Sequence, residues 1–266
     1  MDNRPIGVFD SGIGGLTVVD ALIKTLPNET IIYLGDTARL PYGNKSSKSI
    51  KLFTKRITQW LIENDCKIII VACNTASALA LKFLRSQFDI PIIGVIKPGA
   101  ILANERTQTN RIGVLGTLAT ISSKSYEKTL LDINHNISVF SKACPLFVPL
   151  AEEGWIKGEI PKSIARVYLK EIKESKIDTL ILGCTHYPIM RSVISEVLGK
   201  GIILIDSGEA SAKSVKKILM EKNINAGDDN YGIIKCYVTD SIESFNSMVS
   251  TFLKLPINSI NHIELF

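Results

Sequence analysis

KIIIVACNTAS (residues 67–77) and DTLILGCTHYP (residues 178–188) repeat one pattern at two distant places in the chain. In each, an apolar run rich in Ile and Leu leads to one small residue, then to a cysteine and a short polar stretch. Such a run predicts a buried strand, and ligands bind at the carboxyl ends of strands in open α/β sheets. The repetition therefore predicts two half-molecules, each presenting one thiol, Cys73 or Cys184, at the tip of a strand.

Short apolar, β-branched runs alternate with helix-length amphipathic segments along the whole chain. This rhythm predicts an α/β fold with parallel sheets covered by helices. The nine runs are RPIGVF, TIIYLG, KIIIVA, PIIGV, RIGVLG, NISVFS, TLILG, GIILI and IIKCYV.

Two short segments are candidate crossings between two lobes. The KPGA turn (97–100) follows the fourth run, and DSGEA (206–210) follows the eighth. We expect one lobe to contain residues 1–97 plus 207–266 and the second to contain 98–206. A simple division into amino- and carboxyl-terminal halves near residue 100 is the alternative.

Composition favours a globular protein with reduced thiols. The chain has 266 residues, 45% of them hydrophobic, a net charge of +5 and five cysteines without a CxxC pair. An odd number of cysteines without such a pair fits reduced thiols better than a disulfide framework or a zinc site. No apolar stretch reaches the roughly 18 residues of a membrane span, and no signal peptide is recognisable, so we expect a cytoplasmic protein. The basic residues are scattered without interleaved aromatics, which favours solvated helix faces over a nucleic-acid surface.

Several runs end in a residue that can ionise or bind a polar ligand. Convergence of such groups at one edge of the sheets predicts a pocket, although any single Asp or Thr there could instead cap a helix. These residues are Asp10, Asp36, Cys73, Thr117, Cys184 and Asp206.

The first loop, DSGIGGLTV (10–18), is rich in glycine and opens a helix. Backbone N–H groups and the helix dipole predict an anion cradle there. The loop matches neither GxGxxG nor a P-loop, which disfavours a nucleotide. A substrate carboxylate fits equally well, and the CNTAS and CTHYP segments offer two further helix starts.

A thiol at a helix N-terminus is expected to have a pKa below the free value of about 8.5, so Cys73 and Cys184 could act as acid, base or nucleophile. His186 could polarise the thiol of Cys184 or donate to a ligand. It has no spaced partner for a metal, so no metal is expected. Glu152 is expected in a loop, as a solvated acid, before a helix that begins near Pro161.

Three further cysteines lack the strand-end setting, and we interpret them as packing residues. They are Cys66, Cys144 and Cys236.

At these motifs the chain resembles the glutamate racemases, cofactor-independent members of the aspartate/glutamate racemase superfamily. The matching motifs follow the family order over nearly the whole chain. They are GVFDSGIGGLTV (7–18), YLGDTARLPYG (33–43), VACNTASA (71–78), GVLGT (113–117), VPLAEEG (148–154) and LILGCTHYP (180–188).

The resemblance implies an isomerase that interconverts L- and D-glutamate without pyridoxal phosphate or another cofactor and supplies D-glutamate for bacterial peptidoglycan. It implies two α/β lobes related by a pseudo-twofold axis, with the active site in the cleft between them. Glutamate is the implied partner, no nucleic acid or membrane is expected, and a homodimer stays open.

The same resemblance implies roles for individual residues. Cys73 and Cys184 look like the two acid/base groups, with Asp10 and His186 as their respective helpers. Asp36 and Glu152 look like further ionisable groups of the catalytic site. Besides Asp10 and His186, the implied substrate contacts are Ser11, Pro41, Tyr42, Gly43, Asn74, Thr75, Thr117 and Thr185.

Inverting a tetrahedral carbon by proton exchange needs a base on one face and an acid on the other, which two matched thiols could supply. Three alternatives stay open: a racemase for another substrate such as aspartate, a hydrolase that uses Cys184 and His186, and a non-catalytic protein that closes around a small acid. Pyridoxal phosphate would need a Schiff-base lysine. Lys97 is the nearest candidate, and we interpret it as part of the lobe hinge.

Overall fold

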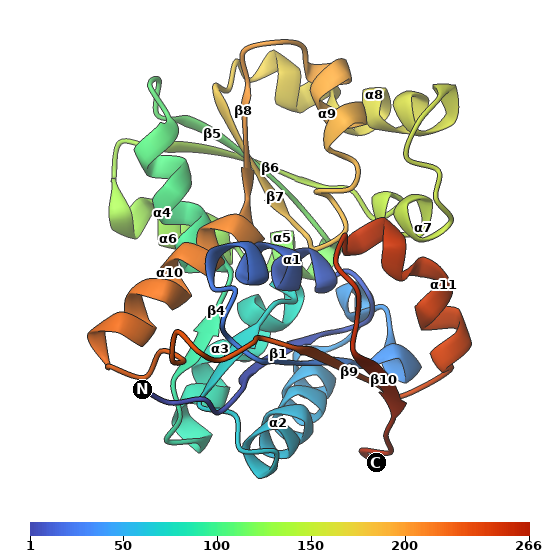
Figure 1. Ribbon diagram of the computed structural model, residues 1–266. Coiled ribbons are helices and arrows are strands. Elements are labelled where there is room, and N and C mark those ends of the chain that lie inside the picture. Colours follow the sequence, from blue (N-terminus) through green and yellow to red (C-terminus); the bar gives the residue numbers. More distant parts are fainter.

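The computed structural model describes residues 1–266 and contains two separate sheets (Figure 1). The larger sheet has the strand order β10-β9-β2-β1-β3-β4, the smaller has the order β6-β5-β7-β8, and every neighbouring pair is parallel. The predicted α/β class with two parallel sheets is confirmed. The strands are β1 (Ile6–Asp10), β2 (Ile31–Gly35), β3 (Ile68–Val71), β4 (Ile92–Gly94), β5 (Arg111–Gly116), β6 (Ser138–Ala143), β7 (Thr179–Gly183), β8 (Ile203–Asp206), β9 (Ile234–Val238) and β10 (Ser259–His262).

Helices cover both sheets, and in Figure 1 the smaller sheet lies above the larger one with α1 between them. The α-helices are α1 (Leu16–Thr25), α2 (Ser47–Glu63), α3 (Asn74–Gln87), α4 (Ile96–Arg106), α5 (Leu118–Ser122), α6 (Ser125–Ile133), α7 (Phe147–Glu152), α8 (Glu159–Glu174), α9 (Arg191–Leu198), α10 (Ser207–Glu221) and α11 (Ile242–Phe252).

The interior strand β3 shows why the apolar runs predict the sheets. Ile68 and Ile70 pack in one core cluster with residues of α1, whereas Ile69 and Val71 pack in another with residues of α2 and α3. Successive side chains of a strand point to opposite faces, so a strand covered on both sides needs an unbroken apolar run.

The expected KPGA turn (97–100) is wrong, because these residues form the first turn of α4. Proline is tolerated there, where its missing N–H has no helical partner. Ile96, Ala100 and Ala103 of α4 pack against strands of the smaller sheet. The crossings between the sheets are therefore the starts of α4 and α10, which pack on each other. The division into 1–97 plus 207–266 and 98–206 stays a prediction.

Strand β10 has no counterpart among the nine predicted runs. Its sequence, SINH, has a single apolar residue, and it pairs only with β9 at the edge of the larger sheet. An edge strand with an open face needs little hydrophobicity, so its pattern does not stand out in the sequence.

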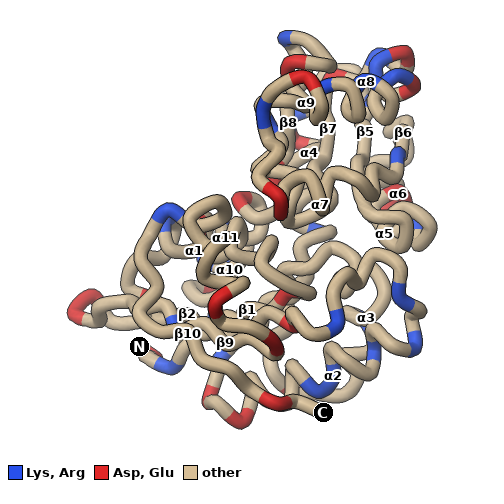
Figure 2. The backbone as a smooth tube through the Cα atoms, turned by 90° about the vertical axis from the view of Figure 1, so that its right-hand side faces the viewer, with Lys and Arg blue, Asp and Glu red and all other residues tan.

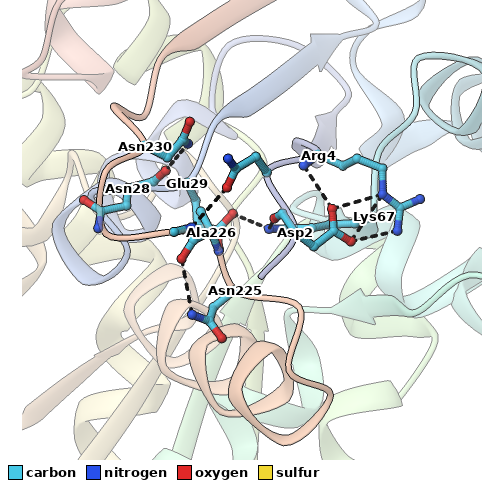
Figure 3. Close-up of polar contacts among 10 residues, drawn as sticks. Asp2, Arg4, Asn28, Glu29, Lys67, Asn225, Ala226 and Asn230 are labelled. Atoms are coloured by element: carbon cyan, nitrogen blue, oxygen red, sulfur yellow. Dashed lines mark hydrogen bonds and ion pairs between the residues drawn. The ribbon is translucent and has the colours of Figure 1, made fainter.

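A buried ion pair lies before the amino ends of the larger sheet's strands (Figure 3). Nζ of Lys67 lies 2.6 Å from Oε2 of Glu29, and neither side chain is more than 3% exposed. Lys67 also donates to the carbonyl oxygen of Asp2 (2.6 Å), and the N–H of Ala226 donates to Glu29 (2.8 Å). The pair thus joins the amino-terminal segment and the loop before β9 to the sheet, at the end remote from the strand tips.

Charged residues of both signs are scattered over both lobes, with several Lys and Arg along α2 (Figure 2). None of the helices combines the length and the apolar character that crossing a membrane requires.

Candidate active site

The carboxyl ends of strands from both sheets meet at one cavity of about 390 Å³. The first lobe contributes residues after β1, β2 and β3, and the second contributes residues after β5, β6 and β7. The lining residues are Ser11, Leu40, Pro41, Tyr42, Gly43, Asn44, Cys73, Asn74, Thr75, Thr117, Leu118, Pro145, Val148, Pro149, Glu152, Cys184, Thr185 and His186.

This cavity brings together all of the residues to which the family resemblance gives a role, except Asp10 and Asp36. Six lining residues are not among those named from the sequence. Half of them directly adjoin named motif residues, and the other half are apolar wall residues before Glu152, which carry no chemical signature. The six are Leu40, Asn44, Leu118, Pro145, Val148 and Pro149.

Cys73 lies at the N-cap of α3, as its sequence predicts, but with the opposite effect on its pKa. The thiol is only 6% exposed, and burial raises its pKa well above the ordinary value; the Asp10 carboxylate adds to the rise. The expected lowering by the helix dipole is therefore wrong, because desolvation of a thiolate outweighs a partial charge. Sγ of Cys73 lies 4.0 Å from the hydroxyl of Ser11.

Cys184 follows β7 but does not begin a helix. The residues after it form turns, and α9 begins only at Arg191, so the expected helix start at CTHYP is wrong. Its polar neighbour is His186, whose Nδ1 lies 3.9 Å from Sγ. Pro188 within the turns removes one backbone donor, which disfavours continuous helix there.

His186 is held between Cys184 and Glu152, with its Nε2 3.0 Å from Oε1 of the glutamate. Burial alone would lower the pKa of His186, but hydrogen bonds to Cys184 and Glu152 outweigh it and raise the pKa to about 10. The imidazole is therefore protonated near neutral pH, between two groups that can be anionic. Glu152 is the last residue of α7 and not part of a loop, and its side chain is 26% exposed.

Asp10 lies fully buried behind the cavity, and it occupies the anion cradle predicted for the first loop. Its Oδ2 accepts hydrogen bonds from the N–H groups of Gly12 (3.2 Å) and Gly15 (3.1 Å). The cradle therefore holds a carboxylate of this chain, which corrects its assignment to a substrate. Burial raises the pKa of Asp10, although the positive His186 and the backbone donors act in the other direction.

The first loop also approaches the second lobe closely. A Cβ at Gly14 would lie 2.4 Å from Oγ1 of Thr185 and 2.5 Å from Nδ1 of His186, so only glycine fits. The hydroxyl of Thr17 donates to the carbonyl oxygen of Thr185 (3.1 Å), and the hydroxyl of Thr185 lies 3.4 Å from Oδ1 of Asp10. These contacts bring the Asp10 and His186 side chains near one another.

Asp36 does not line the cavity, and its contacts place it behind Tyr42. Its Oδ2 accepts a hydrogen bond from the Tyr42 hydroxyl (2.6 Å), and its Oδ1 accepts one from the Thr239 hydroxyl (2.9 Å). Arg39 pairs with the same carboxylate. Asp36 therefore reaches the cavity only through Tyr42, and its role as a further ionisable group of the catalytic site stays a prediction.

Other sequence candidates also lie outside the cavity. Asp206 caps α10 by accepting a hydrogen bond from the N–H of Gly208 (2.8 Å). Lys97 is exposed on α4 and does not reach the lining. Cys66, Cys144 and Cys236 are buried in the cores.

Hydroxyl groups from both lobes meet at one wall of the cavity. Oγ1 of Thr75 lies 2.8 Å from Oγ1 of Thr117 and 3.2 Å from that of Thr120. A Cβ at Gly43 would lie 2.9 Å from Cβ of Thr117. The wall thus offers rotatable donors, which suit the acceptor oxygens of a carboxylate.

Comparisons with known proteins agree with this geometry. The family described as Asp/Glu/Hydantoin racemase matches residues 6–215. A glutamate racemase of Geobacter metallireducens is 44% identical over 262 residues, covering 98% of this chain and 97% of that protein. The structure of glutamate racemase from Francisella tularensis in complex with D-glutamate has a TM-score of 0.93 at 41% identity, and that of a Bacillus anthracis glutamate racemase isoform has a TM-score of 0.93 at 37% identity. Each comparison covers 100% of this chain and 99% of the other.

Two thiols from separate sheets at one cavity, together with these relatives, identify the family. The chain belongs to the Asp/Glu/hydantoin racemase family, and it is an isomerase that acts on an amino acid.

Proposed function

We propose that this protein interconverts L- and D-glutamate by proton transfer between the two cavity cysteines, Cys73 and Cys184. The observation that carries the proposal is that both thiols line one cavity from the tips of different sheets. Glutamate is the substrate of choice because the similar proteins are glutamate racemases and one of them was solved with D-glutamate.

The reaction needs one thiol and one thiolate before each turnover. Burial and Asp10 favour the protonated form of Cys73. The imidazolium of His186, 3.9 Å from Sγ, stabilises negative charge on Cys184 by Coulomb attraction. In this state Cys184 takes the α-proton from one face and Cys73 donates a proton to the opposite face. The enantiomer requires the reverse protonation state and the reverse transfer.

The α-proton of an amino acid is far less acidic than a thiol, so the site must also stabilise the carbanion. Donors fixed in advance in a cavity with little water are the most effective means. The hydroxyls of Ser11, Thr75 and Thr185 and the amide of Asn74 line this cavity. Asp10 and His186 are the proposed helpers of Cys73 and Cys184, and Glu152 holds the imidazole.

The direct test is a racemisation assay on purified protein from which any cofactor has been removed. Incubation with D-glutamate in D₂O should produce L-glutamate with deuterium at the α-carbon and a decaying circular dichroism signal. A parallel incubation with aspartate distinguishes a glutamate racemase from a racemase for aspartate. Racemisation of aspartate but not glutamate would contradict the substrate, and no exchange with either would favour a binding protein.

A hydrolase using Cys184 and His186 leaves Cys73 without a role, and an acyl-enzyme trapped on Cys184 would favour it. As the resemblance implies, the D-glutamate formed would supply peptidoglycan synthesis in the cytoplasm. The oligomeric state, including a homodimer, stays a prediction.

A further inference from the structure

Asn74 carries a buried hydrogen-bond donor without a partner. It is the first residue of α3, directly after Cys73, and it lines the cavity while being only 2% exposed. Its Oδ1 accepts a hydrogen bond, but its Nδ2 has none. A buried donor left unpaired is costly, so such an atom beside a cavity points to a ligand acceptor.

The partner of Oδ1 comes from the other lobe. The hydroxyl of Tyr126, on α6, donates to Oδ1 of Asn74 at 2.7 Å. Tyr126 is 2% exposed and does not itself line the cavity. Tyr126 therefore contacts the cavity residue Asn74 without lining the cavity itself.

The same hydroxyl lies where the two crossings between the sheets meet. A Cβ at Gly99, in α4, would lie 3.5 Å from the Tyr126 hydroxyl oxygen and 3.4 Å from Cβ of Ser207, the first residue of α10. The Tyr126–Asn74 hydrogen bond thus joins α6 of one lobe to α3 of the other beside both connecting helices.

We propose that Tyr126 is a positioning residue for the substrate: by holding Oδ1 of Asn74, it keeps the amide N–H₂ group available to a substrate carboxylate in the cavity. A carboxylate only accepts hydrogen bonds, so the reversed amide would present oxygen to oxygen and repel it. The inference rests on the proposed function, because it takes glutamate as the ligand.

Tyr126→Phe keeps the ring and removes only the hydroxyl, which frees the amide to rotate. The KM for both glutamate enantiomers should rise roughly tenfold, the effect of one lost hydrogen bond, while kcat changes less than about twofold. Ser211→Ala is the matched control. It removes a buried hydroxyl that donates to the carbonyl oxygen of Ser207 (2.6 Å) on the same connecting helix, and its KM should stay within about twofold of the parent.

A double-mutant cycle separates positioning from lobe packing. In an Asn74→Ala background, Tyr126→Phe should have no further effect on KM, because the amide that it orients is gone. If the double variant showed the product of the two single-variant increases in KM, the inference would be overturned. An unchanged KM in Tyr126→Phe alone would also overturn it.

Asn74→Asp tests the amide orientation if Tyr126→Phe does not fold. It keeps an acceptor for Tyr126 but replaces the free donor by an anionic oxygen, so its KM should exceed that of Asn74→Ala. Equal KM values in the two variants would overturn the inference.

Calorimetric Kd values for racemic glutamate on the same proteins should follow the same pattern, and they test the inference without turnover. A parent protein that binds but does not racemise glutamate would contradict the proposed function alone. A parent that does not bind glutamate would contradict both.

Discussion

The two half-sites occupy equivalent places in the fold, yet their surroundings carry opposite charge. Cys73 and Cys184 each follow the strand next to one edge of a parallel sheet, β3 beside β4 and β7 beside β8. Cys73 faces the buried carboxyl group of Asp10, whereas Cys184 faces the imidazolium of His186. The duplicated scaffold thus fixes where the thiols lie, and the residues after each strand give each thiol a neighbour of different charge.

This difference suits a two-base racemase at rest. Two thiolates could not donate a proton, and two thiols could not abstract one. In the proposed mechanism, an electrostatic bias between equivalent positions would give one acid and one base without a rearrangement of the chain.

The largest effect should come from removing either sulfur. Cys73→Ser and Cys184→Ser should each reduce racemisation by about 10³-fold or more, because a hydroxyl is a far weaker acid than a thiol. Circular dichroism of both glutamate enantiomers measures the loss. A substrate with a good β-leaving group should still be eliminated by the surviving thiol, which serves as the folding control. Full racemase activity in either variant would end the two-base account.

Replacing either proposed helper, Asp10 or His186, should make the two directions of racemisation differ in kcat. Asp10→Asn should lower kcat mainly in the direction that uses Cys73 as base, and His186→Asn mainly in the other direction, each by roughly 10- to 100-fold. The two enantiomers are equally stable, so the equilibrium constant is one and kcat/KM must be the same in both directions for every variant. A difference between the directions can therefore appear only in kcat, with a matching change in KM. Equal kcat losses both ways would contradict these roles.

The pH dependence of stability should report the charge on His186. Its pKa of about 10 in the folded state lies above the unfolded value of 6.5, so its contribution is complete below the unfolded value and is lost as pH rises through about 10. A thiolate at Cys184 would take up a proton on unfolding and offset this change, so the measurement uses the Cys184→Ser variant, in which Glu152 still pairs with His186. Its free energy of unfolding should fall as pH rises from about 6.5 to 8.5, by at most about 1.4 kcal/mol per pH unit. Urea denaturation measures this slope.

His186→Asn is the control for that slope and should show a flatter profile over the same range. The control is made in the same Cys184→Ser protein. Cys66, Cys144 and Cys236 do not confuse the comparison, because the ordinary thiol pKa of 9.0 lies above this window and burial raises their pKa further, to about 12. Identical slopes for parent and variant would argue against a protonated His186.

Removing the remote ion pair between Lys67 and Glu29 (Figure 3) should have the smallest effect on the difference between the two half-sites. Lys67→Met leaves Glu29 buried without its partner and should lower the free energy of unfolding by about 3–5 kcal/mol. Below the unfolding temperature, the ratio of kcat in the two directions should stay that of the parent. A changed ratio would show that the bias between the half-sites depends on more than their own neighbours.

Local sequence patterns predict the parallel sheets and the paired cysteines well. Apolar runs such as 68–71 must be buried on both faces, and the repeated run-plus-cysteine pattern places two thiols at strand tips. The helical start of α4 and strand β10 are less visible, because a Pro-Gly pair resembles a turn and an edge strand needs few apolar residues.

The electrostatics of the site depend on contacts between distant segments, which the sequence does not display. Burial and Asp10 reverse the expected pKa change of Cys73, and Glu152 meets His186 across 34 positions of the chain. Likewise, the backbone N–H groups of the first loop bind the carboxylate of Asp10, a residue of the same loop. Only the folded arrangement of these groups reveals them.

The most direct test of the central claim is the early fate of deuterium in D₂O. With two thiols on opposite faces of the α-carbon, newly formed L-glutamate should carry solvent deuterium while the unreacted D-glutamate remains protiated. NMR or mass spectrometry at low conversion measures both pools. Deuterium entering the unreacted enantiomer as fast as the product, or product that retains the substrate's own α-hydrogen, would show that one group serves both faces.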